Sequence, residues 1–366
     1  MPEGRADVLT GTAAVETALS DGVPFGSHSY IAGEVATVYA DLLAVLAEES
    51  VAAKDLSAAL DRMDPASRPS VLRDSLLRRT IEDGVCRTVK GIDTIEPAML
   101  DELLAETASE LAVGHRTLLN EHARGAPLGP TSDFGYVWVG EPRDQLPGRR
   151  FVDEVTKRVP RFRVQGATPD QVESLSRGVR LATRVAPHLA SSALSHSFMV
   201  VLGEFEAEDQ RFNSFTLPGL PGVLILSPHV LSSDTTAAEA LFHEAFHLKF
   251  LDIDYIHPLF EVGFRQETSP RVTPVWHADD PGRGNWPVDR VLTSMHVYLA
   301  LTVFLERAAG ADVPPGWADA AERSVQCRTR ATWLCDAAQP HADHLTDSGR
   351  RFIAWIRSQL DGLEAC

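Results

Sequence analysis

The sequence predicts an α+β protein that is mostly helical and contains one small β-sheet. Apolar residues recur at three- and four-residue spacing from Lys54 to Met63 and from Met99 to Val113, which is typical of helices. Short β-type runs stand in the middle of the chain, as at Ser197–Glu204 and Gly222–Leu226. We therefore expect a small sheet set among many helices.

The N-terminal third is expected to be all helical. The stretch from about residue 30 to 120 shows helical periodicity, with a break at Pro65 and Pro69, and it contains no strand pattern. Between Gly125 and Gly148 the composition shifts to glycine, proline and aromatic residues. The expected domains are a helical N-terminal part at 1–125 and a second domain at 126–366.

The second domain is expected to begin with strands and one helix. Thr168 and Pro169 suit the cap and first position of a helix that ends near Leu189. Pro-Gly pairs at 218–219 and 221–222 separate two strand-like runs, which predicts a hairpin. The expected strands are Tyr136–Val139, Ser197–Glu204, Phe212–Leu217 and Gly222–Leu226.

Helices are expected to complete the chain. Thr236 and Glu239 have the spacing of a capping box, which predicts a helix from about Thr236 to Leu251. Residues 263–287 are rich in proline and glycine and are expected to form loops. Further helices are expected at Val288–Ala309 and at Trp317–Leu363, the second interrupted near Pro340.

Charge and cysteine content exclude several classes of protein. The 366 residues carry a formal charge of −17, from 34 basic and 51 acidic residues, which argues against a nucleic-acid or anionic-membrane binder. The four cysteines form no Cys-x-x-Cys pair, so a thiolate zinc site is not expected. Residues 1–19 lack a signal-peptide core, and no run approaches the ~20 apolar residues of a membrane span. We expect a cytoplasmic protein.

The segment Phe242–Leu248 carries the most specific chemical signal. His243 and His247 are four residues apart, so on a helix their imidazoles lie on one face and can bind one metal ion. The carboxylate of Glu244 can reach a water molecule on that metal. We interpret His243 and His247 as metal ligands and Glu244 as a catalytic residue.

Two histidines need a third ligand, and two candidates stay open. The metzincin pattern is excluded, because Phe250 and Ile253 occupy its glycine and histidine positions. Glu267 stands twenty residues after His247, as in thermolysin-like enzymes, but Pro270 makes a long helix there doubtful. His296 falls on the apolar stripe of the following helix and is the preferred candidate. His257 and His277 are lesser ones.

Two resemblances suggest what the metal does. A strand followed by the motif helix is similar to the core of the zincin metalloproteases. From Leu241 to about Arg307 the chain also resembles the α-ketoglutarate-dependent, HExxH-type β-hydroxylases of ribosomally made precursor peptides. The shared features are the motif with its Lys249 and Leu251-Asp252, the segment 274–283, and the apolar helix that follows. His277, Gly282 and Gly284 depart from the family pattern.

The second resemblance implies a non-haem Fe(II) site that also takes α-ketoglutarate. It carries His243 and His247 over as ligands, His296 as the third, and Arg283 or Arg290 as the fork for the cofactor's distal carboxylate. The implied reaction is hydroxylation of a side-chain β-carbon in a precursor peptide. A zinc metallopeptidase using His243, His247 and Glu267, with Glu244 as general base, is the alternative. A third hypothesis is a non-catalytic helical binding protein. The sequence leaves the oligomeric state open.

Overall fold

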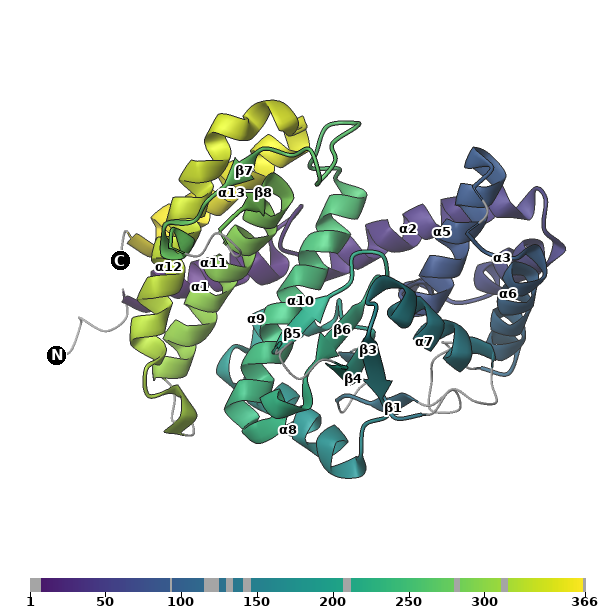
Figure 1. The fold of residues 1–366 in the computed structure, drawn as a ribbon, viewed down its shortest axis with the longest axis horizontal. Helices are drawn as coiled ribbons and strands as arrows, with labels where there is room; N and C mark the ends of the chain where they lie inside the picture. Colours follow the sequence, from purple (N-terminus) through teal and green to yellow (C-terminus); the bar gives the residue numbers. More distant parts are fainter. Residues whose placement is uncertain are drawn as a thin grey trace. The chain divides into compact units, whose positions relative to one another are not determined.

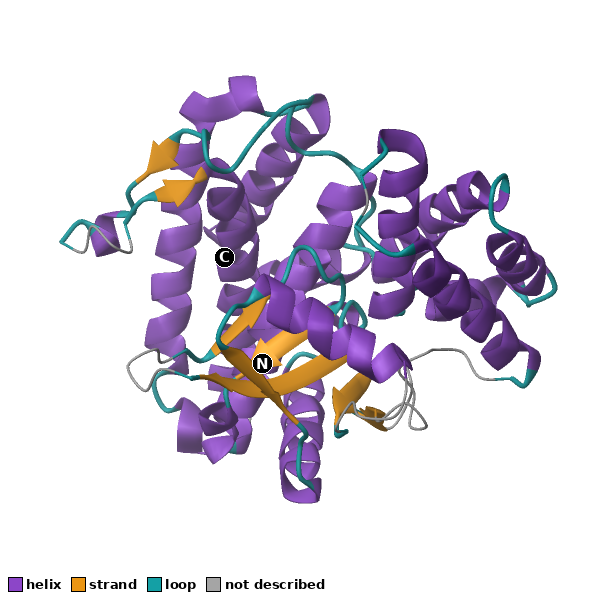
Figure 2. Ribbon diagram, turned by 45° about the vertical axis from the view of Figure 1, so that its right-hand side comes forward, coloured by secondary structure: helices purple, strands orange, loops and turns teal. Residues whose placement is uncertain are grey.

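Helices dominate the computed structural model of this chain. It describes residues 8–92, 94–114, 125–129, 134–140, 146–206, 212–279, 284–310 and 315–364. Helix accounts for 69% of the structure, and a small mixed sheet accompanies it, which confirms the mostly helical class (Figure 2). In the described ranges the element order runs from α1 to α13.

The chain folds into two compact units, each built from separated stretches of sequence. The first unit comprises Met1–His28, Ala182–Ala193 and Lys249–Cys366, and the second comprises Ser29–Leu181 and Leu194–Leu248. None of the limits between the two units falls at residues 125/126, where the domain boundary was expected. The helix α10 (Asp234–Ile256) passes from the second unit into the first at Leu248.

The sheet of the second unit is mixed and small (Figure 1). Its central strand β4 (Met199–Phe205) runs parallel to β2 (Tyr136–Trp138) and to β6 (Val223–Leu226). The strand β5 (Ser214–Thr216) pairs antiparallel with β6, as the predicted hairpin requires, and it ends the sheet on that side. Two further strands, β1 (Gly125–Pro127) and β3 (Phe162–Gln165), were not predicted. The core of this unit is formed by β6, which is buried throughout, and by the first five residues of β4, which are also buried.

The helices of the second unit follow the predicted periodicity in most places. They are α2 (His28–Ala47), α3 (Val51–Asp61), α4 (Arg68–Leu72), α5 (Ser75–Lys90), α6 (Pro97–Ala112), α7 (Leu146–Arg158) and α8 (Pro169–Val185), of which α2 and α8 cross a unit limit. The predicted cap of α8 at Thr168 is confirmed and forms a capping box, because the Gln171 amide donates to the Thr168 hydroxyl and the Thr168 amide donates to the Gln171 side chain. The glycine- and proline-rich stretch before 148 leads into α7, which the sequence did not predict.

The first unit consists of helices and one two-stranded ribbon. Its elements are α1 (Val8–Asp21), α9 (Pro187–Leu194, its last residue across the limit), β7 (Arg271–Val272), β8 (Trp286–Pro287), α11 (Val288–Gly310), α12 (Ala320–Ala338) and α13 (Asp347–Glu364). The helix α11 begins where it was predicted and ends one residue later. The expected interruption near Pro340 is a 3₁₀ segment, Gln339–His344, between α12 and α13.

Two described helices, α2 and α11, are long and apolar enough to cross a membrane by length and composition. The expectation that no segment approaches such a span is therefore not met. The apolar window of α11 is 72% buried and that of α2 is 33% buried. Because a buried core helix passes the same test, this is weak evidence, and the cytoplasmic location stays a prediction.

Candidate metal centre

The motif helix α10 begins earlier than its predicted cap. Ser233 is the capping residue, because its hydroxyl accepts a hydrogen bond from the Thr236 amide at 3.1 Å. Arg177 on α8 adds an ion pair to Asp234 in the first turn of the helix, at 3.0 Å. Close packing of the two helices depends on Gly178, where an added Cβ would lie 3.0 Å from the Ala237 side chain. The motif is therefore carried on a firmly anchored helix.

Apolar residues fix the orientation of this helix. Phe242 and Phe246 are completely buried, and their ring centroids lie 4.9 Å apart. Each precedes a histidine directly, so burying the two phenylalanines turns His243 and His247 together onto the neighbouring face. Both histidines are half-buried. The helical period thus places the two imidazoles side by side, and each ring is partly accessible to solvent.

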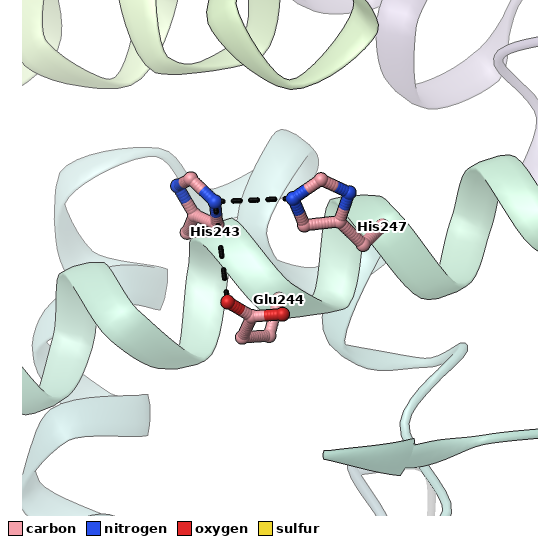
Figure 3. A group of neighbouring side chains, drawn as sticks. All are labelled: His243, Glu244 and His247. Atoms are coloured by element: carbon pink, nitrogen blue, oxygen red, sulfur yellow. Dashed lines mark hydrogen bonds and ion pairs between the residues drawn. The ribbon is translucent and has the colours of Figure 1, made fainter. Parts of the chain in front are cut away.

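The two imidazoles converge (Figure 3). Their Nε2 atoms are 3.1 Å apart. Two nitrogen ligands at about 2.1 Å from one ion lie roughly 3 Å apart, so this spacing fits a shared metal. Among the described residues, the group whose candidate ligand atoms all lie within 4.8 Å of one another consists of His243, Glu244 and His247. This juxtaposition agrees with the i, i+4 prediction.

Glu244 lies deep beside the two histidines. Its side chain is 4% exposed, and its Oε1 atom lies 3.9 Å from Nε2 of His243 (Figure 3). Ser214 on β5 donates a hydrogen bond to the same Oε1 at 2.7 Å. Among the described residues, nothing hydrogen-bonds the other oxygen, Oε2, which is buried. Burial raises the pKa of Glu244, while His243 and the Ser214 hydrogen bond act to lower it.

Ser214 was missed in the sequence, because nothing local marks it. It stands on a three-residue strand and reaches a carboxylate thirty positions away. The same end of that strand carries a second contact, in which Asn213 Oδ1 lies 2.7 Å from Nε2 of His229 and Ser227 Oγ lies 2.8 Å from Nδ1 of His229. These contacts hold the start of β5 and keep Ser214 opposite Glu244.

Lys249 follows the motif and is completely buried in the first unit. Its ammonium donates hydrogen bonds to the carbonyl of Leu19 at 2.7 Å, to the hydroxyl of Ser192 at 2.8 Å and to the carbonyl of Gly26. Burial lowers the pKa of Lys249 to about 7, against an opposing effect of Asp21. The contacts of this lysine are structural ones, and they tie three stretches of the chain together.

His296 lies on α11 in the first unit and is completely buried, as predicted for a residue on the apolar stripe. Its ring packs against aromatic rings of that unit, with centroid distances of 5.6 Å to Phe352, 6.2 Å to Trp355 and 6.3 Å to Phe250. His243 and His247 belong to the second unit. A role for His296 as third ligand stays a prediction.

The remaining candidates are exposed or half-buried residues of the first unit, or they lie outside the described residues. Glu267 is exposed in a turn, and no helix forms around it. Arg290 is exposed in the first turn of α11, with its guanidinium 4.4 Å from the ring centroid of Trp286. His257 is half-buried against Phe25, and His277 is half-buried against Trp286. Arg283 lies outside the described residues.

No protein-family model matches the chain, and no characterised protein matches its sequence. The case for a function therefore rests on the two converging histidines, the buried glutamate and the elements that hold them.

Proposed function

We propose that this chain is a mononuclear metal enzyme whose ion is held by His243 and His247. The observation that carries the proposal is the 3.1 Å separation of the two Nε2 atoms above a buried carboxylate. Imidazole pairs of this kind suit divalent iron and zinc, and an open side is needed for catalysis. The helix α10 beside the small sheet supports a zincin-like core as part of the same proposal.

Of the two chemistries, we favour an Fe(II)- and α-ketoglutarate-dependent hydroxylase that acts on a precursor peptide. Such an enzyme converts a C–H bond, O₂ and α-ketoglutarate into an alcohol, succinate and CO₂. The resemblance of residues 241–307 to that family supports it. So does the turn at Glu267, because the competing thermolysin-like zinc site would need that carboxylate on a helix.

Within this proposal each group of the site has a separate task. His243 and His247 bind the ion, His296 is the proposed third ligand, and Ser214 fixes the direction of the Glu244 carboxylate. Arg283 or Arg290 would pair with the distal carboxylate of the cofactor. An oxygenase needs no protein base to activate water, so Glu244 would orient a ligand or the substrate.

A zinc metallopeptidase remains the second candidate, because one observation favours it. The Oε2 atom of Glu244 is buried and, in the described part of the chain, has no hydrogen-bond partner. A buried carboxylate that one hydrogen bond orients, and whose second oxygen has no described partner, suits a general base for a metal-bound water. In that reading Glu267 supplies the third ligand.

The two proposals are separated by purifying the protein without oxygen, measuring its metal content, and assaying it in two ways. Incubation with Fe(II), α-ketoglutarate and a candidate precursor peptide should release succinate and add one oxygen to the peptide. Incubation with Zn²⁺ and the same peptide should leave it uncut. His243→Ala and His247→Ala should bind no metal, and His188→Ala, which removes an exposed histidine, should bind it normally. Peptide cleavage without succinate would reverse the preference.

A further inference from the structure

Six side chains of the first unit form an aromatic and arginine cluster, and of these the proposed metal site has a use only for Arg290. Trp276 is at its centre, with ring centroids 5.4 Å from Trp333, 6.1 Å from Trp286 and 6.2 Å from Tyr298. The guanidinium of Arg330 lies 5.2 Å from the Trp276 ring centroid. Arg290 lies over Trp286 at the border of the cluster. All six belong to the stretch Lys249–Cys366.

The cluster is rich in hydrogen-bond donors and poor in acceptors. The Nε1 atom of Trp276 is buried, and no described group accepts its hydrogen bond. Arg330 also hydrogen-bonds Tyr298, whose ring centroid it approaches to 5.6 Å. Indole and guanidinium groups donate and never accept, so within the cluster only the Tyr298 oxygen can accept a hydrogen bond.

Two described arginines, Arg290 and Arg330, lie over rings of the cluster, although the whole chain carries −17. No described carboxylate forms an ion pair with Arg330 within 4.0 Å. Arg290 is different, because Tyr298 and Asp289 both act to raise its pKa against the lowering effect of burial. Arg330 is therefore the charge of the cluster that no described carboxylate pairs with, and its guanidinium lies over the rings of Trp276 and Tyr298.

We propose that Trp276, Tyr298 and Arg330 form a binding site for an organic carboxylate. A monoanion matches the single uncompensated charge, whereas a phosphate dianion would need a second one. The planar carboxylate fits the forked N–H groups of Arg330, and the Trp276 N–H supplies a further donor. The rings of Trp286 and Trp333 offer flat apolar surface for the body that carries the carboxylate. The site does not depend on the proposed metal chemistry.

The test measures binding to the full chain after metal removal with a chelator, by calorimetry and by tryptophan fluorescence. Benzoate is the probe, benzamide is its uncharged isostere, and inorganic phosphate is the competing anion. Saturable binding of benzoate, with much weaker binding of benzamide and phosphate, is expected. Benzamide binding as tightly as benzoate would overturn the proposal, as would a preference for phosphate or the lack of saturable benzoate binding.

Variants locate the site. Arg330→Met should weaken benzoate binding by about tenfold, the usual effect of losing one charged hydrogen-bond partner, and Arg330→Lys should weaken it less. Trp276→Phe keeps a ring but removes the N–H donor, so it should weaken binding as well. Arg328→Met, on the same helix, and His243→Ala should bind like the original protein. Unchanged binding in both Arg330 variants would contradict the proposed site.

A second pair of probes identifies the source of the carboxylate. A short peptide with a free C-terminus is compared with the same peptide in amidated form. Tighter binding of the free form than of benzoate means that the site takes a peptide carboxylate. Equal binding of the two peptides, with benzoate still bound through Arg330, means that it takes a small free acid.

Discussion

At the scale of single residues, the hydrogen bond from Ser214 to Glu244 is the contact that most directly sets up the site. We expect Ser214→Ala to weaken metal binding by roughly tenfold. Residues that hydrogen-bond the side chains next to a metal ion hold those side chains in place, and losing them usually lowers the affinity for the metal. Ser214→Thr keeps the hydroxyl and should restore binding. Thr216→Ala, two residues along the same strand, is the matched control. Competition with a chelator of known affinity measures all three, and equal affinities for Ser214→Ala and Thr216→Ala would contradict this role.

Asp254 gives a prediction about pH. Burial and the nearby Asp289 raise its pKa above the ordinary value of 3.8, although a hydrogen bond from the Leu259 amide opposes this. Between those two pKa values the folded state holds more protons than the unfolded state, so this group's contribution to stability falls as the pH rises. Asp254→Asn keeps an oxygen for the Leu259 amide, which the carboxylate accepts at 2.9 Å, and carries no charge.

We therefore expect Asp254→Asn to have a larger free energy of unfolding than the original protein at pH 7. The gain should shrink as the pH falls, and it should vanish well below 3.8, where the carboxylate is protonated in both states. Urea unfolding at several pH values measures this, with the exposed Asp279→Asn as control. A difference that does not change with pH would show that the charge of Asp254 is not its cause.

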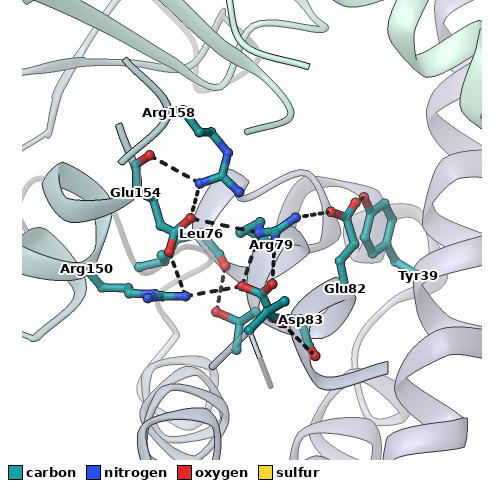
Figure 4. Close-up of polar contacts among 10 residues, drawn as sticks. Tyr39, Leu76, Arg79, Glu82, Asp83, Arg150, Glu154 and Arg158 are labelled. Carbon is teal, nitrogen blue, oxygen red and sulfur yellow. Dashed lines mark hydrogen bonds and ion pairs between the residues drawn. The ribbon is translucent and has the colours of Figure 1, made fainter. Parts of the chain in front are cut away.

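At the scale of elements, a buried ionic cluster joins α5 to α7 (Figure 4). Arg150 bonds both Asp83, at 3.2 Å, and Glu154, at 2.7 Å, while Arg79 bonds Asp83 and Arg158 bonds Glu154. The side chains of Asp83 and Glu154 are each 1% exposed. Because each buried carboxylate has two arginine partners, neither is left as an isolated charge.

Removing one carboxylate should therefore be costly. We expect Asp83→Ala to lower the free energy of unfolding by about 3 kcal/mol or more, since Arg79 and Arg150 each lose a carboxylate partner that is 1% exposed. Glu173→Ala, which breaks the exposed pairs to Arg177 and Arg180, should cost about 0.5 kcal/mol or less. Repeating the unfolding at high salt distinguishes the two pairs, because only the exposed one is screened. Similar losses for both variants would contradict the buried role.

The elements also show what sequence patterns can and cannot predict. The helices α8 and α11 were predictable because a capping box and an apolar stripe are local signals. The helix α7 was not, since its first residues include Pro147 and Gly148, and its ion pair to α5 joins distant segments of the chain. In the site, the i, i+4 histidines follow from helix geometry alone. Ser214 and the Trp276 cluster depend on contacts between distant segments, which spacing in the sequence does not encode.

At the scale of the whole molecule, Lys249 shows how a unit is assembled from separated stretches of chain. It belongs to the stretch that starts at residue 249, and it bonds Leu19 and Gly26 in the N-terminal stretch and Ser192 in the middle one. Leu19 lies in the last turn of α1, where a cation also suits the helix dipole. One ammonium group therefore connects all three stretches of the first unit.

We expect Lys249→Met to lower the free energy of unfolding by about 3 kcal/mol, because it leaves buried carbonyl groups without donors. Ser192→Ala removes one of the three acceptors and should cost about 1 kcal/mol. Lys54→Met, at an exposed position of α3, is the control and should change little. Urea unfolding measures the three, and a Lys249→Met protein as stable as the original would mean that the buried ammonium gives no net stability.

Metal binding should also be visible in the stability of the molecule, independently of any reaction. An ion that binds the folded chain and not the unfolded chain adds about 2.7 kcal/mol when its free concentration is a hundred times the Kd. Co²⁺ or Zn²⁺ should therefore raise the melting temperature of the original protein and of His188→Ala, and a chelator should reverse the rise. His243→Ala and His247→Ala should show no rise, because each removes one of the two converging Nε2 atoms. An equal rise in all four proteins would show that the ion binds away from His243 and His247. No rise in any of them would favour the third hypothesis, a non-catalytic helical binding protein.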